Sequence, residues 1–412
     1  MNEGRRQQNY MQKGIEFLFV FVMTQYFGAL GQYSLVLNSV FAQLWSNLYM
    51  IAKIMLIAFI LVDMIAHKSY KVKCENFLII ILIILIGCIS IYKSGIRNET
   101  VSFTFRLFLT ITIGIYVATK YSEFQILRML KVAQTMFLIL TIVFIGFFPK
   151  HAFFIDADGR KVLLGIYTTK NPCAFELVFG VLLFYIGMRN STRISKKVVA
   201  WCMIGIQIAL AFQCRCVGAI LTGMVTIIAA EFLIQKKNVR LDYLYMAINI
   251  GFFVVVFFLL PFCVPLLEKL GRDITLTGRT NIWLSILQLL KNGNYLFGYG
   301  YESFWNNESI TRVLYNFYVI NGVKYNYTGA HNTIIELLLY FGIIGIIVYL
   351  TVVLSLLKKT SKFEGTRGYF VLICFFFFTI HGVIERSLSD SAYDTMIFVM
   401  MLRMNSHSEN FQ

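Results

Sequence analysis

Charged residues are scarce in this chain. Only 14% of its 412 residues are Asp, Glu, Lys or Arg, whereas 58% are hydrophobic. Ordinary soluble domains are roughly 25% charged, so this balance excludes a soluble fold. The hydrophobic residues form continuous runs of about 17 to 25 residues, the length of a membrane-spanning helix. Because the runs do not alternate apolar with polar residues, they predict helices rather than the strands of a membrane barrel.

Acidic residues are scarcer than basic ones, 21 against 37, and the net charge is +16. In a soluble protein this excess would suggest a nucleic-acid partner. No basic patch here is interleaved with exposed aromatic residues, so nucleic acid is excluded as a partner. The cations gather instead in short segments between the apolar runs, where Lys and Arg set the orientation of a membrane protein.

We predict an all-α polytopic integral membrane protein, with residues 1–412 forming a single membrane domain of about twelve transmembrane helices. With a cytoplasmic N-terminus, 21 of the 37 Lys and Arg residues fall in short cytoplasmic loops or tails, as the positive-inside rule requires. Both termini are then cytoplasmic. Residues 266–331 form one large extracytoplasmic loop between helices nine and ten. The predicted spans are 15–30, 45–65, 76–92, 103–119, 132–148, 173–188, 198–214, 217–234, 243–265, 332–357, 368–385 and 391–404.

Many motifs of catalysis and metal binding are missing. The chain has no Walker A, GxSxG, HExxH or CxxC sequence, and its eight cysteines lack zinc-ligand spacing. The segment from Asp156 to Gly159 resembles the start of a calcium loop, but the twelfth position is Tyr167 rather than Glu. No carboxylate cluster offers a metal site outside the membrane. We therefore expect no metal, no cofactor and a metal-independent reaction.

The large loop carries the most informative residues. Gly278-Arg279 precedes a segment, 280–291, whose apolar residues recur at helical spacing. This predicts an amphipathic helix that either lies along the membrane interface or packs on the bundle. An Arg at a helix N-terminus offers donors for phosphate, while the alternative is an Arg that reaches the lipid headgroups. Gly298-Tyr299-Gly300 indicates a turn.

The end of the loop carries a candidate base. His331 and Asn332 precede the tenth span, and Glu336 lies one turn inside it. A histidine can take a proton from a hydroxyl near neutral pH. The helix dipole at this position favours a neutral imidazole. The alternative is a structural histidine.

Other cations stand close to the membrane. Arg215 separates the seventh and eighth spans with almost no loop, and a cation so near the membrane interior is costly and points to function. Arg106 lies near the outer end of the fourth span. Lys170 and Asn171 open the sixth span, where Lys170 either contacts phosphate or only begins the helix. We expect Glu176 and Glu336 to pair with the arginines.

Together these residues resemble the O-antigen ligase/polymerase superfamily of bacterial membrane proteins, often called Wzy-like. The similarity covers the architecture of nearly the whole chain, with one large outer loop after the ninth span. The motifs that carry it are Lys170-Asn171-Pro172, Arg215, Gly278-Arg279 with Trp283, Gly298-Tyr299-Gly300, Ala330-His331-Asn332 and Gly342-Ile343-Ile344-Gly345. The chain departs from the family where Cys214 and Cys216 flank Arg215, and where Cys173 follows Pro172.

The resemblance implies glycosyl transfer at the outer face of the cytoplasmic membrane, with no cofactor. It implies a polysaccharide polymerase for O-antigen, capsule or exopolysaccharide, with an undecaprenyl-pyrophosphate-linked oligosaccharide as donor and inversion at the sugar carbon. Arg215 and Arg279 would stabilise the pyrophosphate, and His331 would activate the acceptor hydroxyl. Arg160 and Lys170 are secondary candidates, and Arg106, Asn171, Asn332 and Glu336 complete the expected substrate-binding set. A chain-length regulator and a flippase of the same pathway are expected partners besides the lipid bilayer.

Three alternatives compete with a polymerase. A ligase would move the glycan to a lipid or wall anchor instead of a lipid-linked repeat unit. A lipid-linked oligosaccharide flippase would also need arginines, but transporter sites lie near the bilayer midplane in broken helices. A receptor or scaffold would leave His331, Arg215 and Arg279 without a shared role.

Overall fold

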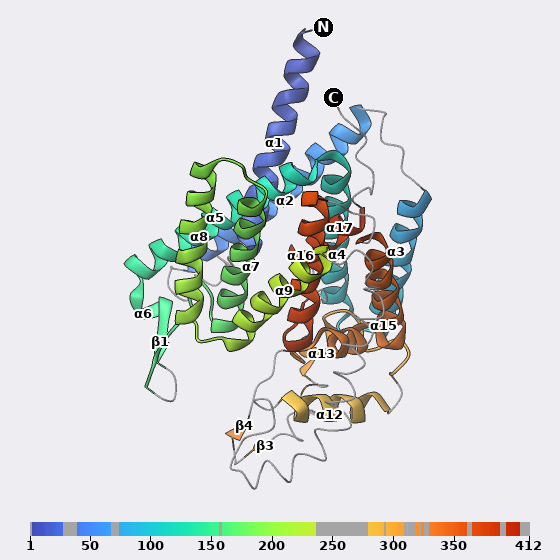
Figure 1. Ribbon diagram of the computed structural model, residues 1–412. Coiled ribbons are helices and arrows are strands. Elements are labelled where there is room, and N and C mark those ends of the chain that lie inside the picture. The colour runs from blue at the N-terminus through green and yellow to red at the C-terminus, as the bar shows by residue number, and fades with distance from the viewer. Residues whose placement is uncertain are drawn as a thin grey trace.

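The structure is a computed structural model in which α-helices make up most of the described residues (Figure 1). It describes residues 2–27, 39–66, 74–155, 159–235, 279–291, 294–308, 311, 319–320, 323–324, 329–360, 365–387 and 393–403. The long helices are α1 (Asn2–Phe27), α2 (Ser39–Ala66), α3 (Cys74–Lys93), α4 (Arg97–Lys120), α5 (Glu123–Phe147), α7 (Lys170–Arg189), α8 (Ile194–Gln213), α9 (Val217–Gln235), α15 (Thr333–Thr360), α16 (Gly365–Ile384) and α17 (Tyr393–Arg403).

These helices occupy the apolar runs that the sequence indicated. Each predicted span except 243–265 coincides with a helix, and 243–265 lies outside the described residues. In the described part of the chain, seven helices are long and apolar enough to cross a membrane. They comprise Asn47–Ala66 of α2, Thr333–Lys358 of α15, Val217–Ile234 of α9, and all of α4, α5, α7 and α8. The helical membrane fold is therefore supported, while the total of twelve stays a prediction.

Local sequence signals explain where α5 starts. Ser122 precedes the helix and accepts a hydrogen bond from the backbone N–H of Gln125, while the Gln125 side chain accepts one from the backbone N–H of Ser122 at 2.9 Å. This reciprocal capping box satisfies two donors that the first helical turn leaves free. An ion pair at the same end of the bundle joins α4 to α2, because Lys120 Nζ lies 2.9 Å from a carboxylate oxygen of Asp63.

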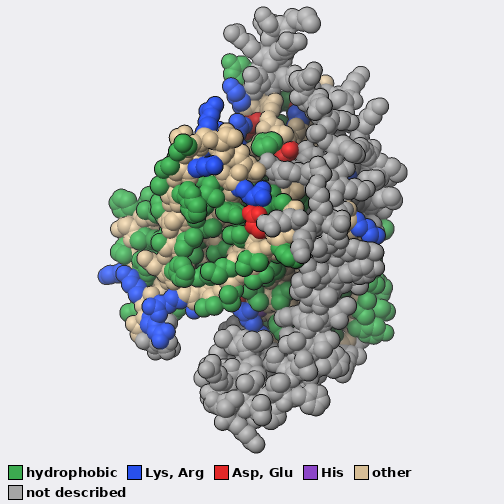
Figure 2. Space-filling view, in the orientation of Figure 1, with side chains coloured by type: hydrophobic (Ala, Val, Ile, Leu, Met, Phe, Trp, Pro, Cys, Tyr) green, Lys and Arg blue, Asp and Glu red, His purple; other side chains and the backbone are tan. Residues whose placement is uncertain are grey.

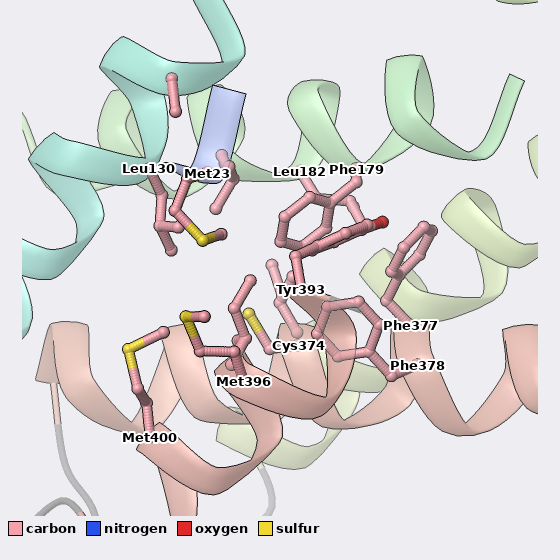
Figure 3. Close-up of a cluster of buried hydrophobic side chains, with 14 of the residues drawn as sticks. Met23, Leu130, Phe179, Leu182, Cys374, Phe377, Phe378, Tyr393, Met396 and Met400 are labelled. Atoms are coloured by element: carbon pink, nitrogen blue, oxygen red, sulfur yellow. The ribbon is translucent and has the colours of Figure 1, made fainter. Parts of the chain in front are cut away.

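The main core lies where α1, α5, α7, α16 and α17 meet (Figure 3). Met23 of α1 and Leu130 of α5 face Phe179 of α7 across this core, and the rings of Phe377 and Tyr393 pack around Phe179. Ring centroids of Phe179 and Phe377 lie 5.3 Å apart. Lipid tails are as apolar as these side chains, so close packing rather than exclusion from water holds such helices together in a bilayer.

Large apolar side chains also cover the outside of the bundle. Figure 2 shows a broad hydrophobic area with Lys and Arg side chains above and below it. Four such side chains are 59–79% exposed: Ile65 of α2 (77%), Ile194 and Trp201 of α8 (79% and 59%) and Ile228 of α9 (68%). Exposed apolar surface on this scale marks a contact with lipid.

Shorter elements gather at the end of the bundle where α7 begins. There α6 (Pro149–Ala152) leads into an antiparallel hairpin of β1 (Phe153–Ile155) and β2 (Lys161–Leu163), in which Phe154 pairs with Val162. The described parts of the 266–331 loop add α12 (Arg279–Lys291), α13 (Ser303–Asn306) and a small hairpin of β3 (Val319–Ile320) and β4 (Val323–Lys324). Figure 1 places α12 and both β3 and β4 below the bundle.

Helix α15 is broken at Gly342, where φ is 64° and ψ is −156°. The break frees carbonyl groups, and the segment 294–300 docks on them. Tyr299 N–H donates to Leu339 O at 2.7 Å, and Gly300 N–H donates to Tyr340 O at 3.2 Å. A Cβ on Gly342 would stand 2.3 Å from the backbone of Leu296, so only glycine allows this approach. The predicted turn at 298–300 thus holds the loop against α15.

Candidate functional site

Helix α12 lies against the bundle through its apolar face. Ile282, Trp283 and Ile286 are buried in a cluster with residues of α13 and α15. The sequence left two arrangements open for this amphipathic segment, one along the membrane interface and one packed on the bundle. The structure shows the helix packed on the bundle. The first described residue of the helix is Arg279, so this cation lies in the first described turn of α12.

A clamp on Ala330 fixes the backbone just before His331. The indole N–H of Trp283 donates to Ala330 O at 2.6 Å, and Ala330 N–H donates to the buried carboxylate of Glu336 at 2.5 Å. The other oxygen of Glu336 accepts from Trp305 Nε1 at 2.8 Å. With both backbone groups held, His331 adopts φ = 52°, a left-handed conformation unusual for any residue but glycine. Glu336 thus fixes the backbone before His331 by accepting hydrogen bonds from two neutral N–H groups.

Asn332 joins two helices at their ends. Its side-chain oxygen accepts from the N–H groups of Ile334 and Ile335, at 3.0 and 3.1 Å, and so caps α15. Its amide nitrogen donates to Val383 O of α16 at 3.0 Å. Both polar ends of the side chain are therefore used within the protein, and Asn332 is 4% exposed. Its contribution is to set α15 beside α16.

Three other parts of the chain converge on Glu385, directly after the end of α16. One carboxylate oxygen lies 2.7 Å from His331 Nδ1. The other accepts from Arg279 Nη2 at 2.6 Å and from Asn171 Nδ2 at 2.8 Å. Arg279 Nη1 also donates to the backbone oxygen of Ile384. The structure therefore brings together three of the predicted residues, from the starts of α7, α12 and α15.

The Glu385 carboxylate is ionised. Its burial favours the neutral acid, but the hydrogen bond from His331 and the charges of His331 and Arg279 outweigh burial and lower the pKa of Glu385 to about 2. An ionised carboxylate only accepts hydrogen bonds, so His331 Nδ1 carries the proton. The other ring nitrogen, Nε2, is then the acceptor whenever the imidazole is neutral. The His331 side chain is 35% exposed, which leaves part of the ring accessible.

Arg215 stands at the same end of the bundle, in the tight turn between α8 and α9. Its φ is 50° and its side chain is exposed. Two observations place this turn beside Glu385. A Cβ on Gly218 would lie 3.2 Å from the Ile384 side chain. Burial raises the pKa of Cys216, with Glu385 raising it further and Lys170 opposing the rise. Among the described residues, Arg215 makes no side-chain hydrogen bond or ion pair.

Some predicted residues lie apart from Glu385. Arg160 is exposed in the connection between β1 and β2. Arg106 is exposed on α4, where its guanidinium lies 5.6 Å from the ring centre of Phe103. The expected pairing of Glu176 with an arginine is wrong, because this acid is buried and hydrogen-bonds to Tyr393 of α17. Lys170 begins α7 beside Asn171.

The arrangement agrees with a comparison to protein families. Residues 162–350 match a family model described as O-antigen ligase. Over this segment, 189 of the 412 residues, the chain is similar to the O-antigen ligase/polymerase superfamily. No curated protein matches the chain significantly. Members of the superfamily transfer glycosyl groups, and the match supports a glycan-transfer function related to polysaccharides. The matched segment contains Asn171, Arg215, Arg279 and His331.

Glu385 lies beyond the matched segment and was not predicted from the sequence. It lies at the last position of an apolar run, 368–385. Because Arg386 follows it directly, the sequence alone suggests that Glu385 pairs with Arg386. In the structure, Arg386 lies instead 3.5 Å from Glu302 and 3.2 Å from the Tyr340 hydroxyl. One signal was present: a carboxylate at the end of a membrane helix is costly and needs a partner.

Proposed function

We propose that the protein is a polysaccharide polymerase, which transfers a glycan from undecaprenyl pyrophosphate to a sugar hydroxyl of a second lipid-linked repeat unit. The observation that carries this proposal is the convergence of His331 and Arg279 on Glu385 at one end of a membrane bundle. The site combines a base with an accessible nitrogen and a group of cations beside the place where a lipid headgroup would stand. The proposed location is the outer face of the bacterial cytoplasmic membrane.

The reaction is a direct displacement. The acceptor hydroxyl oxygen forms a bond to the anomeric carbon, and its proton passes to His331 Nε2. The bond between that carbon and the pyrophosphate oxygen breaks, and its electron pair leaves with undecaprenyl pyrophosphate. Attack from the face opposite the leaving group inverts the sugar carbon. Glu385 orients the imidazole and stabilises the imidazolium that forms, as a carboxylate does in hydrolase triads.

Arginines stabilise the departing pyrophosphate. Arg279 has five N–H donors, of which the structure shows two engaged, by Ile384 O and Glu385. The remaining donors and the exposed guanidinium of Arg215 supply hydrogen bonds and positive charge to the leaving group. With Lys170 at the start of α7, three cations face one carboxylate, so the site keeps a net positive charge.

The substrate-binding set is proposed at two levels. Asn171, Asn332 and Glu336 hold the site in shape through the hydrogen bonds described above. Lys170 lies close enough to the Glu385 cluster to influence Cys216 and is proposed to contact the donor. Arg160 and Arg106 are proposed to contact the glycan farther from the reacting bond.

A ligase is the second candidate, and the matching family, O-antigen ligase, favours it. The two differ in the acceptor alone: a lipid-linked repeat unit for the polymerase, a lipid or wall anchor for the ligase. A reconstituted assay with lipid-linked repeat units as the only glycan separates them, because only a polymerase lengthens these units. The same assay separates an enzyme from a flippase, which would move the units and leave their length unchanged.

The assay also tests the site. In vesicles that present lipid-linked repeat units on the outer leaflet, His331→Ala and Arg279→Ala should each abolish detectable polymer. His151→Ala is the matched control, since His151 is an exposed histidine of α6. Full-length polymer from both His331→Ala and Arg279→Ala would refute the assignment. Nuclear magnetic resonance of donor and product linkages checks the inversion.

A further inference from the structure

A cleft lies at the far end of α7 from Glu385. Helix α7 runs from Lys170 to Arg189, roughly 30 Å at 1.5 Å per residue, so the two ends are well separated. Close to its second end, a cavity of about 330 Å³ opens between α5, α7 and α8. Its walls include Lys131 of α5, Gly187 of α7, and Ser195 and Lys196 of α8. The predicted orientation puts this end on the cytoplasmic side.

Two ammonium groups face this cleft and repel each other. Lys131 and Lys196 interact electrostatically, although they belong to different helices. In the part of the chain that the structure describes, neither lysine forms an ion pair with a carboxylate. Two described acids at this end already have partners: Glu231 is bound by Arg189 and by the hydroxyls of Tyr185 and Tyr369, and Glu16 by Arg128. The repulsion favours an anion between the two lysines.

The start of α8 adds to the positive potential. Arg193 precedes the helix, and no side chain caps the first backbone N–H groups. Ser195, on the cleft wall in the first turn, contributes a hydroxyl that can donate to an oxygen. A cation at a helix N-terminus is normally unfavourable, so the position of Lys196 is itself better explained with an anion present. The main evidence for an anion in this cleft, however, is the pair of lysine charges.

The surroundings of the cleft are apolar on the lipid side. Val198 and Val199 of α8 are 55% and 61% exposed, and Trp201 is 59% exposed. Exposed tryptophan is typical of the boundary between lipid headgroups and tails. In Figure 2, Lys and Arg side chains lie along the upper edge of the hydrophobic surface. The cleft therefore offers cations to a phosphate and apolar surface to the chains attached to it.

We propose that this cleft binds the phosphate of an anionic phospholipid from the surrounding bilayer. The phosphate lies between Lys131 and Lys196 with the Ser195 hydroxyl as a further donor, and the acyl chains follow Val198 and Val199. Basic pockets between membrane helices on the cytoplasmic side bind anionic headgroups by this chemistry. The site is separate from the glycan-transfer site and does not depend on the proposed reaction.

The test measures lipid binding to the full-length protein in detergent. Phosphatidylglycerol is titrated and bound lipid is counted by native mass spectrometry, with phosphatidylcholine as the neutral reference. We expect Lys131→Gln with Lys196→Gln to weaken phosphatidylglycerol binding at least tenfold and to leave phosphatidylcholine unchanged. Lys150→Gln with Lys161→Gln is the matched control, because it removes the same charge from exposed residues that do not line the cleft. Equal binding by the two double variants would overturn the proposal.

A second arm separates a lipid from a soluble anion. Inorganic phosphate at millimolar concentration should not displace phosphatidylglycerol from the wild-type protein, because it lacks the acyl chains. Displacement by inorganic phosphate would overturn the lipid assignment. The single variant Lys196→Gln controls for a folding defect in the double variant, because Lys196 is exposed and its substitution should leave the fold unchanged. This single variant should elute as wild type on gel filtration and still bind phosphatidylglycerol more weakly.

Discussion

His331 Nδ1 lies 2.7 Å from a carboxylate oxygen of Glu385, although 54 positions separate the two residues in the chain. The contact crosses from the start of α15 to the end of α16. It fixes which nitrogen of the imidazole bears the proton and directs the other nitrogen away from the carboxylate. A loop histidine thereby gains an orientation that its own backbone could not provide.

Replacing Glu385 by Gln should lower kcat for polymer formation by up to roughly 10⁴-fold, the cost of replacing the carboxylate that orients the histidine of a hydrolase triad by an amide. KM should change little, because Glu385 is proposed to act through His331 rather than on substrate. Initial rates in the reconstituted assay measure both constants. Glu99→Gln, an exposed acid at the start of α4, is the control. A change in KM alone would contradict the positioning role.

Acid should destabilise the protein through Glu385. Its pKa is about 2 in the folded protein against an ordinary value of 4.5, so the ionised carboxylate stabilises the folded state. That stabilisation is about 3 kcal/mol near neutral pH and is lost as the pH falls from 4.5 towards 2. Thermal unfolding in detergent at pH 6 and pH 3 should show a smaller loss for Glu385→Gln than for wild type. An equal loss in the two proteins would disprove this linkage.

Arg279→Lys should fail to restore activity even though it keeps the charge. Arg279 reaches Ile384 O and Glu385 with two nitrogens of one planar group. Lysine is a single point charge and cannot bridge both acceptors while also meeting a pyrophosphate. We expect at least a tenfold loss of polymer-forming rate. Arg128→Lys is the control: Arg128 of α5 forms an exposed pair with Glu16 of α1, and this variant should have wild-type activity. Normal rates for Arg279→Lys would exclude the two-nitrogen contact.

Gly342→Ala should loosen the loop from α15. Alanine would adopt a positive φ and would meet the backbone of Leu296 at 2.3 Å. The strain alone costs about 1–3 kcal/mol, and the clash adds to it. The unfolding temperature in detergent should fall. Gly205→Ala is a matched control because nothing lies within 4 Å of its Cβ position in α8. There, alanine should be neutral or stabilising, since it favours helix.

The sequence predicted the helices well because their cause is local. A run such as 332–357 needs only its own apolar residues to form a membrane helix, and α15 follows it closely. Arg279 at the start of α12 and Lys170 at the start of α7 were also predicted from adjacent residues. The turn at 298–300 was predicted, but not its partner, since the break at Gly342 depends on the approach of Leu296.

The site itself depends on contacts between distant segments. Glu385 collects Asn171, Arg279 and His331 from three helix starts, and no pattern within any one segment records that meeting. Glu336 shows the same limit. Its burial was expected and Arg386 acts on it electrostatically, but its hydrogen-bond partners are the N–H groups of Ala330 and Trp305. A single sequence shows which residues are costly to bury, but it does not show which partners offset that cost.

The break in α15 divides one apolar run into a part that is buried in protein and a part that has a face exposed to lipid. Before Gly342, Ile335, Leu339 and Tyr340 are 0–3% exposed, so protein surrounds that part. After it, Ile343 and Ile347 are 40% and 57% exposed, so one face of that part meets lipid. A hydropathy profile treats both parts alike. The part after Gly342 has to match the thickness of the bilayer. The part before Gly342 is positioned by its contacts with protein. These contacts, and not the bilayer, therefore set the position of His331 relative to the membrane surface.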